Sequence, residues 1–126
     1  MEPAEVPILM YHEIGYSDSP WCITPQQFEE QMAFLHAQGY KTISLTGLQE
    51  KISHNQPLQE KAVVLTFDDG RKGIHAQALP ILKKYGYTAT IYIVPSWVDG
   101  QNIPSEEAYS AFLSWDELKQ LTPACW

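Results

Sequence analysis

The residues best suited to chemistry lie in the segment AVVLTFDDGRKG, residues 62–73, where two adjacent carboxylates follow an apolar run. Residues 62–67 have the composition of a buried strand, and Asp68, Asp69 and Gly70 come directly after it. Neighbouring negative charges repel each other, and burying either one is unfavourable unless another group compensates it. The segment therefore predicts either a solvated strand-to-helix turn or a cation site.

A metal ion at this position would give the two carboxylates different roles. Carboxylates bind hard and borderline cations, and a catalytic Zn²⁺ keeps one coordination position for water. One aspartate could then bind the metal while the other accepts a proton from the metal-bound water. Asp-Gly is also a common turn dipeptide, so these residues alone leave both alternatives open. A haloacid dehalogenase phosphatase is excluded, because its two aspartates are one residue apart and Phe67 occupies the first of those positions.

The elements around the carboxylate pair alternate between strands and helices. We predict strands at residues 7–11, 41–45, 61–67 and 87–95, and helices at residues 24–39, 46–53, 73–86 and 114–121. The motifs Thr24-x-x-Gln27, Thr46-x-x-Gln49 and Ser114-x-x-Glu117 have the pattern of capping boxes. Alternating elements are typical of βαβ units with a parallel sheet, and function in such folds gathers at the carboxyl ends of the strands. The carboxylate pair lies at such an end.

Composition indicates a globular α/β protein with a single domain over residues 1–126. The chain is 44% hydrophobic and 18% charged, and its net charge of −7 argues against a nucleic-acid or anionic-membrane surface. No apolar run approaches the roughly 18 residues of a membrane span, and the first residues lack a signal-peptide pattern. Cys22 and Cys125 could form one disulfide, but two unrelated thiols are the favoured alternative.

The segments LTFDDG, residues 65–70, and ALPILKKYGYTATIYIV resemble the polysaccharide deacetylase family, also called the NodB-homology or carbohydrate esterase 4 family. The stretches ILMYHEI and TPQQFEEQMAFLHAQGYKTISL are similar to the branch that includes deacetylases of poly-β-1,6-N-acetylglucosamine. This resemblance implies an irregular (β/α)7-type barrel with parallel strands, of which this chain would be the N-terminal portion. It also implies metal-dependent hydrolysis of N-acetyl groups on an N-acetylglucosamine-containing polysaccharide.

The same resemblance implies roles for three residues. Asp68 is expected to be the general base and His12 the general acid. Asp69 is expected to be a ligand of a divalent metal, and Zn²⁺ is the favoured metal. Two further histidine ligands of the family, about four positions apart, would follow the last predicted helix. We therefore expect the domain to be incomplete at its C-terminal end, with weak metal affinity and little activity in this chain alone. His36, His54 and His75 lack that spacing and are expected to be structural or solvated.

Other functional interpretations remain open at this stage. A catalytically inactive sugar-binding relative is the main alternative, with five aromatic residues that could stack on sugars or pack in the core: Tyr92, Trp97, Tyr109, Trp115 and Trp126. A structural or interaction protein is a third alternative, but it offers no reason for the paired carboxylates. The resemblance implies a polysaccharide substrate and an extracytoplasmic or envelope location, and an incomplete barrel would leave a sheet edge open to a homo-oligomer.

Overall fold

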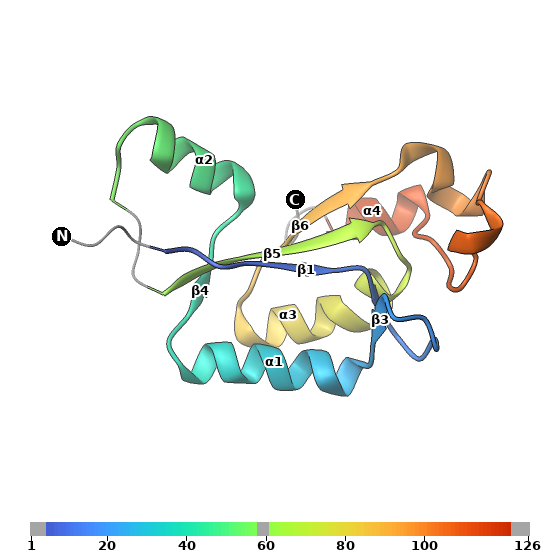
Figure 1. Ribbon diagram of the computed structural model, residues 1–126, viewed down its shortest axis with the longest axis horizontal. Helices are drawn as coiled ribbons and strands as arrows, with labels where there is room; N and C mark the ends of the chain where they lie inside the picture. Colours follow the sequence, from blue (N-terminus) through green and yellow to red (C-terminus); the bar gives the residue numbers. More distant parts are fainter. Residues whose placement is uncertain (1–4, 58–60, 122–126) are drawn as a thin grey trace.

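The computed structural model describes residues 5–57 and 61–121, and a four-stranded parallel sheet forms its centre (Figure 1). Its strands are β1 (Ile8–Tyr11), β4 (Lys41–Thr42), β5 (Ala62–Asp69) and β6 (Thr90–Ile93). β5 pairs in parallel with each of the other three strands. Two short strands, β2 (Glu13–Ile14) and β3 (Cys22–Ile23), form a separate parallel pair. The predicted α/β class with parallel strands is confirmed.

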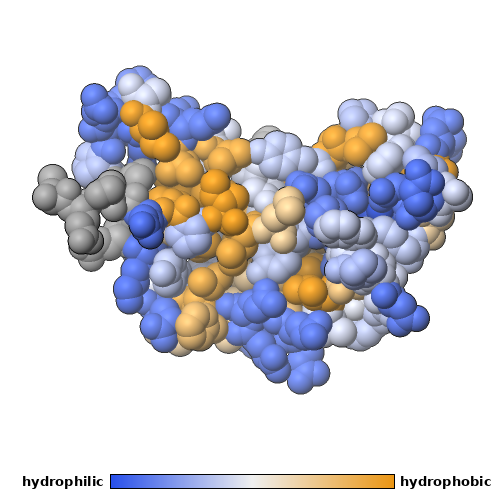
Figure 2. Space-filling view, in the orientation of Figure 1, coloured by the Kyte–Doolittle hydropathy of each residue, from blue (hydrophilic) through white to orange (hydrophobic). Residues whose placement is uncertain are grey.

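Helices lie on either side of the strands in Figure 1, but they do not cover the sheet completely, since Ile8 and Met10 of β1 are 54% and 62% exposed. Hydrophobic residues accordingly gather at the surface in the same view (Figure 2). The α-helices are α1 (Pro25–Ala37), α2 (Leu45–Ser53), α3 (Leu79–Tyr85) and α4 (Trp115–Leu121). A π-helical turn, η1 (Ile74–Ala78), precedes α3, and two 3₁₀ segments follow β6, namely η2 (Pro95–Gly100) and η3 (Ser105–Glu107). In Figure 1, α1 and α3 lie side by side below the strands and α2 lies above them. The carboxyl ends of β5 and β6 point toward the side that carries η2, η3 and α4.

The core lies between β5 and the helices α1 and α3. Residues 62–67 of β5 are buried, as expected for a strand covered on both faces. Three aromatic rings from separate elements pack together, with centroid distances of 5.1 Å for Tyr11–Phe28, 5.4 Å for Tyr11–Phe67 and 5.7 Å for Phe28–Phe67. This cluster fixes β1 and α1 against β5, and so it sets where the residue after β1 lies.

Two of the three predicted capping boxes are confirmed. The Thr24 hydroxyl accepts a hydrogen bond from the Gln27 amide while the Gln27 side chain accepts one from the Thr24 amide. Ser114 and Glu117 make the same reciprocal pair before α4. The third is wrong, because Ser44 caps α2 and accepts from the Gly47 amide. Ser44 satisfies the first free amides of the helix two residues earlier than predicted.

Several predicted boundaries differ from the structure. The predicted strand 41–45 is only two residues long because Ser44 already caps a helix, and the strand predicted at 87–95 is confined to Thr90–Ile93. The predicted helix 73–86 is divided at its proline, since Pro80 cannot donate a backbone hydrogen bond and the turn before it is π-helical. β2 and β3 were not predicted, because two-residue strands carry no periodicity. Three residues named above, Pro123, Cys125 and Trp126, lie outside the described part of the chain.

Gly73 is the position where the start of η1 passes closest to β2. Its amide donates to the carboxylate of Glu13 at 2.9 Å. A Cβ atom added at Gly73 would lie 2.0 Å from Glu13 Oε1 and 2.0 Å from the carbonyl oxygen of Ile14. Only glycine therefore allows this approach, which joins β2 to the helix that follows the carboxylate pair.

We expect Gly73→Ala to destabilise the protein by about 1–3 kcal/mol, because the added methyl group forces the two segments apart. Chemical denaturation of the purified protein measures this change. Gly15→Ala is the matched control, since its Cβ would approach no atom closer than 3.7 Å. Equal midpoints for the two variants would show that the close approach does not constrain the fold.

Candidate active site

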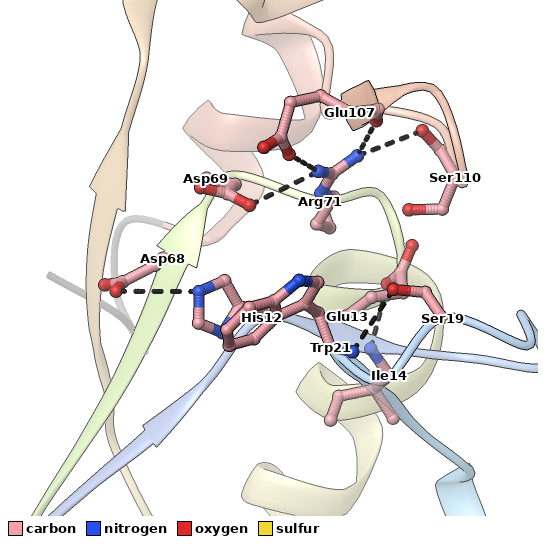
Figure 3. Close-up of polar contacts among 10 residues, drawn as sticks. All are labelled: His12, Glu13, Ile14, Ser19, Trp21, Asp68, Asp69, Arg71, Glu107 and Ser110. Atoms are coloured by element: carbon pink, nitrogen blue, oxygen red, sulfur yellow. Dashed lines mark hydrogen bonds and ion pairs between the residues drawn. The ribbon is translucent and has the colours of Figure 1, made fainter. Parts of the chain in front are cut away.

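The predicted acid and base meet at the carboxyl ends of β1 and β5 (Figure 3). Tyr11 pairs with Phe67 at the end of the ladder, so that His12 and Asp68 are the next residues on neighbouring strands. His12 Nε2 lies 3.9 Å from Asp68 Oδ2, and the two side chains are 18% and 33% exposed. Both side chains are therefore close to each other and accessible from solvent at the rim where α/β folds place their function.

Asp69 has a different partner from Asp68. The φ angles of Asp69 and Gly70 are 78° and 77°, a left-handed conformation that a non-glycine residue adopts only when its surroundings hold it there. Asp69 Oδ2 accepts a hydrogen bond from Arg71 Nη2 at 3.3 Å. Figure 3 shows the Asp68 carboxylate directed toward His12 and the Asp69 carboxylate toward Arg71. Each carboxylate thus has its own nitrogen partner within the protein.

Arg71 is completely buried, and oxygen atoms accept hydrogen bonds from both of its terminal nitrogens, while its Nε has no hydrogen-bond partner. Nη1 donates to the carbonyl oxygens of Glu107 at 2.6 Å and Ser110 at 3.3 Å, and Nη2 also donates to the Glu107 carboxylate. The guanidinium carbon lies 3.9 Å from the ring centroid of Tyr109 and 4.2 Å from that of Phe112. Arg71 therefore ties the segment after β6 to the turn that carries Asp69.

Backbone hydrogen bonds support the same connection. The amide of Leu113 donates to the carbonyl of Gly70 at 3.0 Å, and the amide of Lys72 donates to that of Ala111 at 2.8 Å. The turn after the carboxylate pair is consequently held on both sides of Arg71. Such support limits the movement of the two aspartates relative to each other.

Glu13 is a buried carboxyl group directly after His12, with 5% of the residue exposed. Burial raises its pKa above the ordinary value of 4.5, although the hydrogen bonds from the amides of Ile14 and Gly73 favour the ionised form. These bonds fix the backbone of β2 next to the candidate acid. Glu13 therefore anchors the backbone that directly follows His12.

Trp21 places an indole ring beside His12. The two ring centroids are 4.9 Å apart with the planes tilted by 45°, and Trp21 is 56% exposed.

The remaining histidines lie outside this group. His36 packs near the ring of Tyr85 at 5.5 Å, His54 bonds the Glu50 carbonyl at 2.8 Å, and His75 bonds Gln120 at 2.6 Å. Their surroundings agree with the prediction of structural or solvated roles.

Asp69 suits the predicted role of a metal ligand because one of its oxygens is free of the bond to Arg71 and its side chain is 21% exposed. Within residues 5–57 and 61–121, no group of three or more His, Cys, Asp or Glu side chains is arranged to hold a metal ion. The described residues thus fit part of a metal site, and its other ligands would come from elsewhere.

Three residues of this site were not singled out by sequence reasoning: Glu13, Trp21 and Arg71. Glu13 and Arg71 do have a local signal, since each is a charged residue directly beside a predicted site residue or its glycine. Their burial, however, depends on segments far away in the chain. Trp21 has no local signal, because nothing in the residues around it indicates contact with His12.

We expect Arg71→Met to lower the free energy of unfolding by about 3 kcal/mol, because it leaves carbonyl and carboxylate oxygens without a partner. Lys72→Met is the matched control. Lys72 Nζ is 3.3 Å from Glu117 Oε1, but its side chain is 53% exposed, so its loss should change stability by no more than about 1 kcal/mol. Urea denaturation of both variants measures the difference, and similar losses would contradict the structural role of Arg71.

Glu13 should make stability depend on pH. With its folded pKa above 4.5, the native state binds more protons than the unfolded state between 4.5 and that raised value. Stability should therefore fall as the pH rises through this window. Glu13→Gln should remove this fall, since a glutamine oxygen can still accept from Gly73. Unfolding free energies of the two proteins at pH 4.5 and pH 7 test this, with the exposed Glu30→Gln as control.

Known proteins resemble this chain in sequence. The family model described as polysaccharide deacetylase matches residues 55–124. YxkH of Bacillus subtilis, named as a polysaccharide deacetylase, is 36% identical over 106 residues, which are 84% of this chain and 38% of that protein. The poly-beta-1,6-N-acetyl-D-glucosamine N-deacetylase of Escherichia coli K12 is 43% identical over 70 residues, or 56% of this chain and 10% of that protein.

Solved structures resemble it in fold. IcaB from Ammonifex degensii superposes with a TM-score of 0.84 at 22% identity, covering 99% of this chain and 52% of its own. The Streptococcus pyogenes deacetylase PplD, in complex with acetate, gives a TM-score of 0.79 at 28% identity, covering 98% of this chain and 54% of its own. The chain thus spans about half the length of these solved chains. The fold, the DDG turn and the family match together show that this chain belongs to the polysaccharide deacetylase family.

Proposed function

We propose that this chain carries the base, the acid and one metal ligand of a carbohydrate N-deacetylase. The observation that carries this proposal is the meeting of His12 and Asp68, 3.9 Å apart at the carboxyl ends of two strands, next to Asp69. The substrate class is a polysaccharide that contains N-acetylglucosamine. The names of the Escherichia coli and other relatives, which act on poly-beta-1,6-N-acetyl-D-glucosamine, support this class.

In this mechanism the three residues have separate tasks. A divalent metal, Zn²⁺ in our proposal, would lower the pKa of bound water and polarise the amide oxygen. Asp69 would hold this metal, and Arg71 keeps the Asp69 carboxylate in one orientation. Asp68 removes the proton of the attacking water, and His12 donates a proton to the nitrogen of the leaving amine. The reaction needs one group that accepts a proton and another that donates one, and Asp68 and His12 can fill these two roles separately.

We also propose that the chain forms part of one deacetylase domain whose other metal ligands lie outside the described residues. Its span of 38% of YxkH and about half of the solved relatives supports this. With Asp69 as the one proposed ligand among the described residues, the chain should bind Zn²⁺ weakly, because a single aspartate rarely holds the ion tightly.

We also propose that the protein acts on its polysaccharide substrate at or outside the cell envelope. The described part of the chain contains no helix that meets the length and hydropathy needed to span a membrane.

A sugar-binding protein without catalytic activity is the second candidate. It is favoured by the partner of Asp69, since the Arg71 guanidinium relieves the repulsion between the two carboxylates without a metal. In such a protein the site would bind N-acetylated sugars but release no acetate. The two candidates are therefore separated by an assay of hydrolysis together with one of binding.

The test measures acetate release from N-acetylglucosamine oligomers by the complete protein with added Zn²⁺. We expect Asp68→Asn and His12→Ala each to lower kcat by at least about 100-fold, because each removes a proton-transfer group. Asp116→Asn and His36→Ala are matched controls, since both residues are exposed and lie outside the site. Unchanged rates for Asp68→Asn would refute its role as base. Sugar binding without acetate release by the unmodified protein would support the second candidate.

A further inference from the structure

The loop between β2 and β3 presents Trp21 at the rim of the proposed active site. Trp21 is 56% exposed although indole is a large apolar group, and its ring contacts that of His12 at a tilt of 45°, with 4.9 Å between centroids. The indole and the imidazole lie side by side in Figure 3. A bound molecule that reaches His12 would therefore meet the indole ring as its next neighbour.

The backbone of this loop is held in place by its own hydrogen bonds. The Trp21 carbonyl accepts from the amide of Glu13 at 3.1 Å, and the Trp21 amide donates to the Ser19 hydroxyl at 3.2 Å. The amide of Cys22 donates to the Ser19 carbonyl at 3.1 Å, and the amide of Ser19 donates to the Ser17 hydroxyl at 3.1 Å. Trp21 is thus prearranged in its exposed position, which lowers the entropic cost of binding a ligand there.

A second exposed aromatic residue lies on the other side of the acid–base pair. Tyr92 is opposite Asp68 in the parallel register of β5 and β6, and it is 48% exposed. Residues opposite each other on neighbouring strands project from the same face of the sheet. The order across the rim is therefore Trp21, His12, Asp68 and Tyr92, with an aromatic side chain at each end.

Three other aromatic residues that could stack on a sugar have different surroundings. Trp97 packs against Phe112 with 5.4 Å between ring centroids, and Tyr109 covers the guanidinium group of Arg71. Trp115 is 48% exposed at the start of α4, where its amide bonds Asp99. Trp21 differs from all three because its ring contacts a residue that we place in the chemistry.

We propose that Trp21 is a sugar-stacking platform that binds the hexosamine unit next to the unit that reacts. The apolar C–H face of a β-linked pyranose matches the flat, amphipathic indole, whose exposed face needs such a partner. This inference rests on the proposed deacetylase function, since His12 marks the reacting unit. It predicts that the protein binds oligomers more tightly than single sugars, because only an oligomer reaches both positions.

The experiment measures binding by calorimetry in the complete protein carrying Asp68→Asn, so that hydrolysis does not consume the ligand. The ligands are N-acetylglucosamine and its β-1,6-linked tetramer. We expect Trp21→Ala to weaken tetramer binding by about tenfold and Trp21→Phe to restore most of the affinity, because a phenyl ring still offers a flat apolar face. Phe34→Ala, which removes a 62% exposed aromatic ring of α1, should leave the affinity unchanged.

The inference would be overturned if the Asp68→Asn protein bound the tetramer equally well with and without Trp21→Ala. It would also be overturned if neither protein bound the tetramer. An equal loss in Phe34→Ala would do the same, because it would indicate a general effect of removing exposed aromatic rings. Failure of the Trp21 platform can be distinguished from failure of the proposed catalytic function. Full acetate release by Asp68→Asn would refute the catalytic assignment alone, whereas unchanged binding by Trp21→Ala beside an inactive Asp68→Asn would refute the platform alone.

Discussion

The buried guanidinium group of Arg71 is the interaction on which the arrangement of the site depends. A charge without solvent contact is tolerated only when hydrogen bonds and opposite charges surround it, and here Asp69, Glu107 and two carbonyl groups do so. Meeting this requirement brings the segment after β6 onto the DDG turn. The left-handed turn at Asp69 is therefore held by the same contacts that solvate Arg71 within the protein.

This constraint changes the interpretation of the two adjacent aspartates. From sequence, their repulsion suggested either a solvated turn or an external cation, but the structure places the guanidinium group of Arg71 beside Asp69. The local charge balance is thus compatible with the folded chain before any metal binds. Asp69 would hold the proposed metal while Arg71 orients its carboxylate, as a second group commonly does for a metal ligand.

Local signals predicted most elements because their physical causes are local. The Thr24 and Ser114 boxes satisfy amide groups within the same turn, so their residues are readable in order along the chain. The box at Thr46 failed because Ser44 offered an equally good cap two residues earlier. The short β2 and β3 pair was missed because two residues show no period, and its position depends on the close approach of Glu13 to Gly73.

The sequence by itself determined the apolar strand, the carboxylate pair at its end and the family to which the chain belongs. His12 and Asp68 were also identifiable as candidates, since the motifs that contain them are continuous stretches. Only the tertiary structure decided that His12 lies next to Asp68, that Asp69 bonds Arg71 and that Trp21 lies beside His12. These contacts join residues from different elements, so they follow from strand register and side-chain packing, which no local pattern of residues specifies.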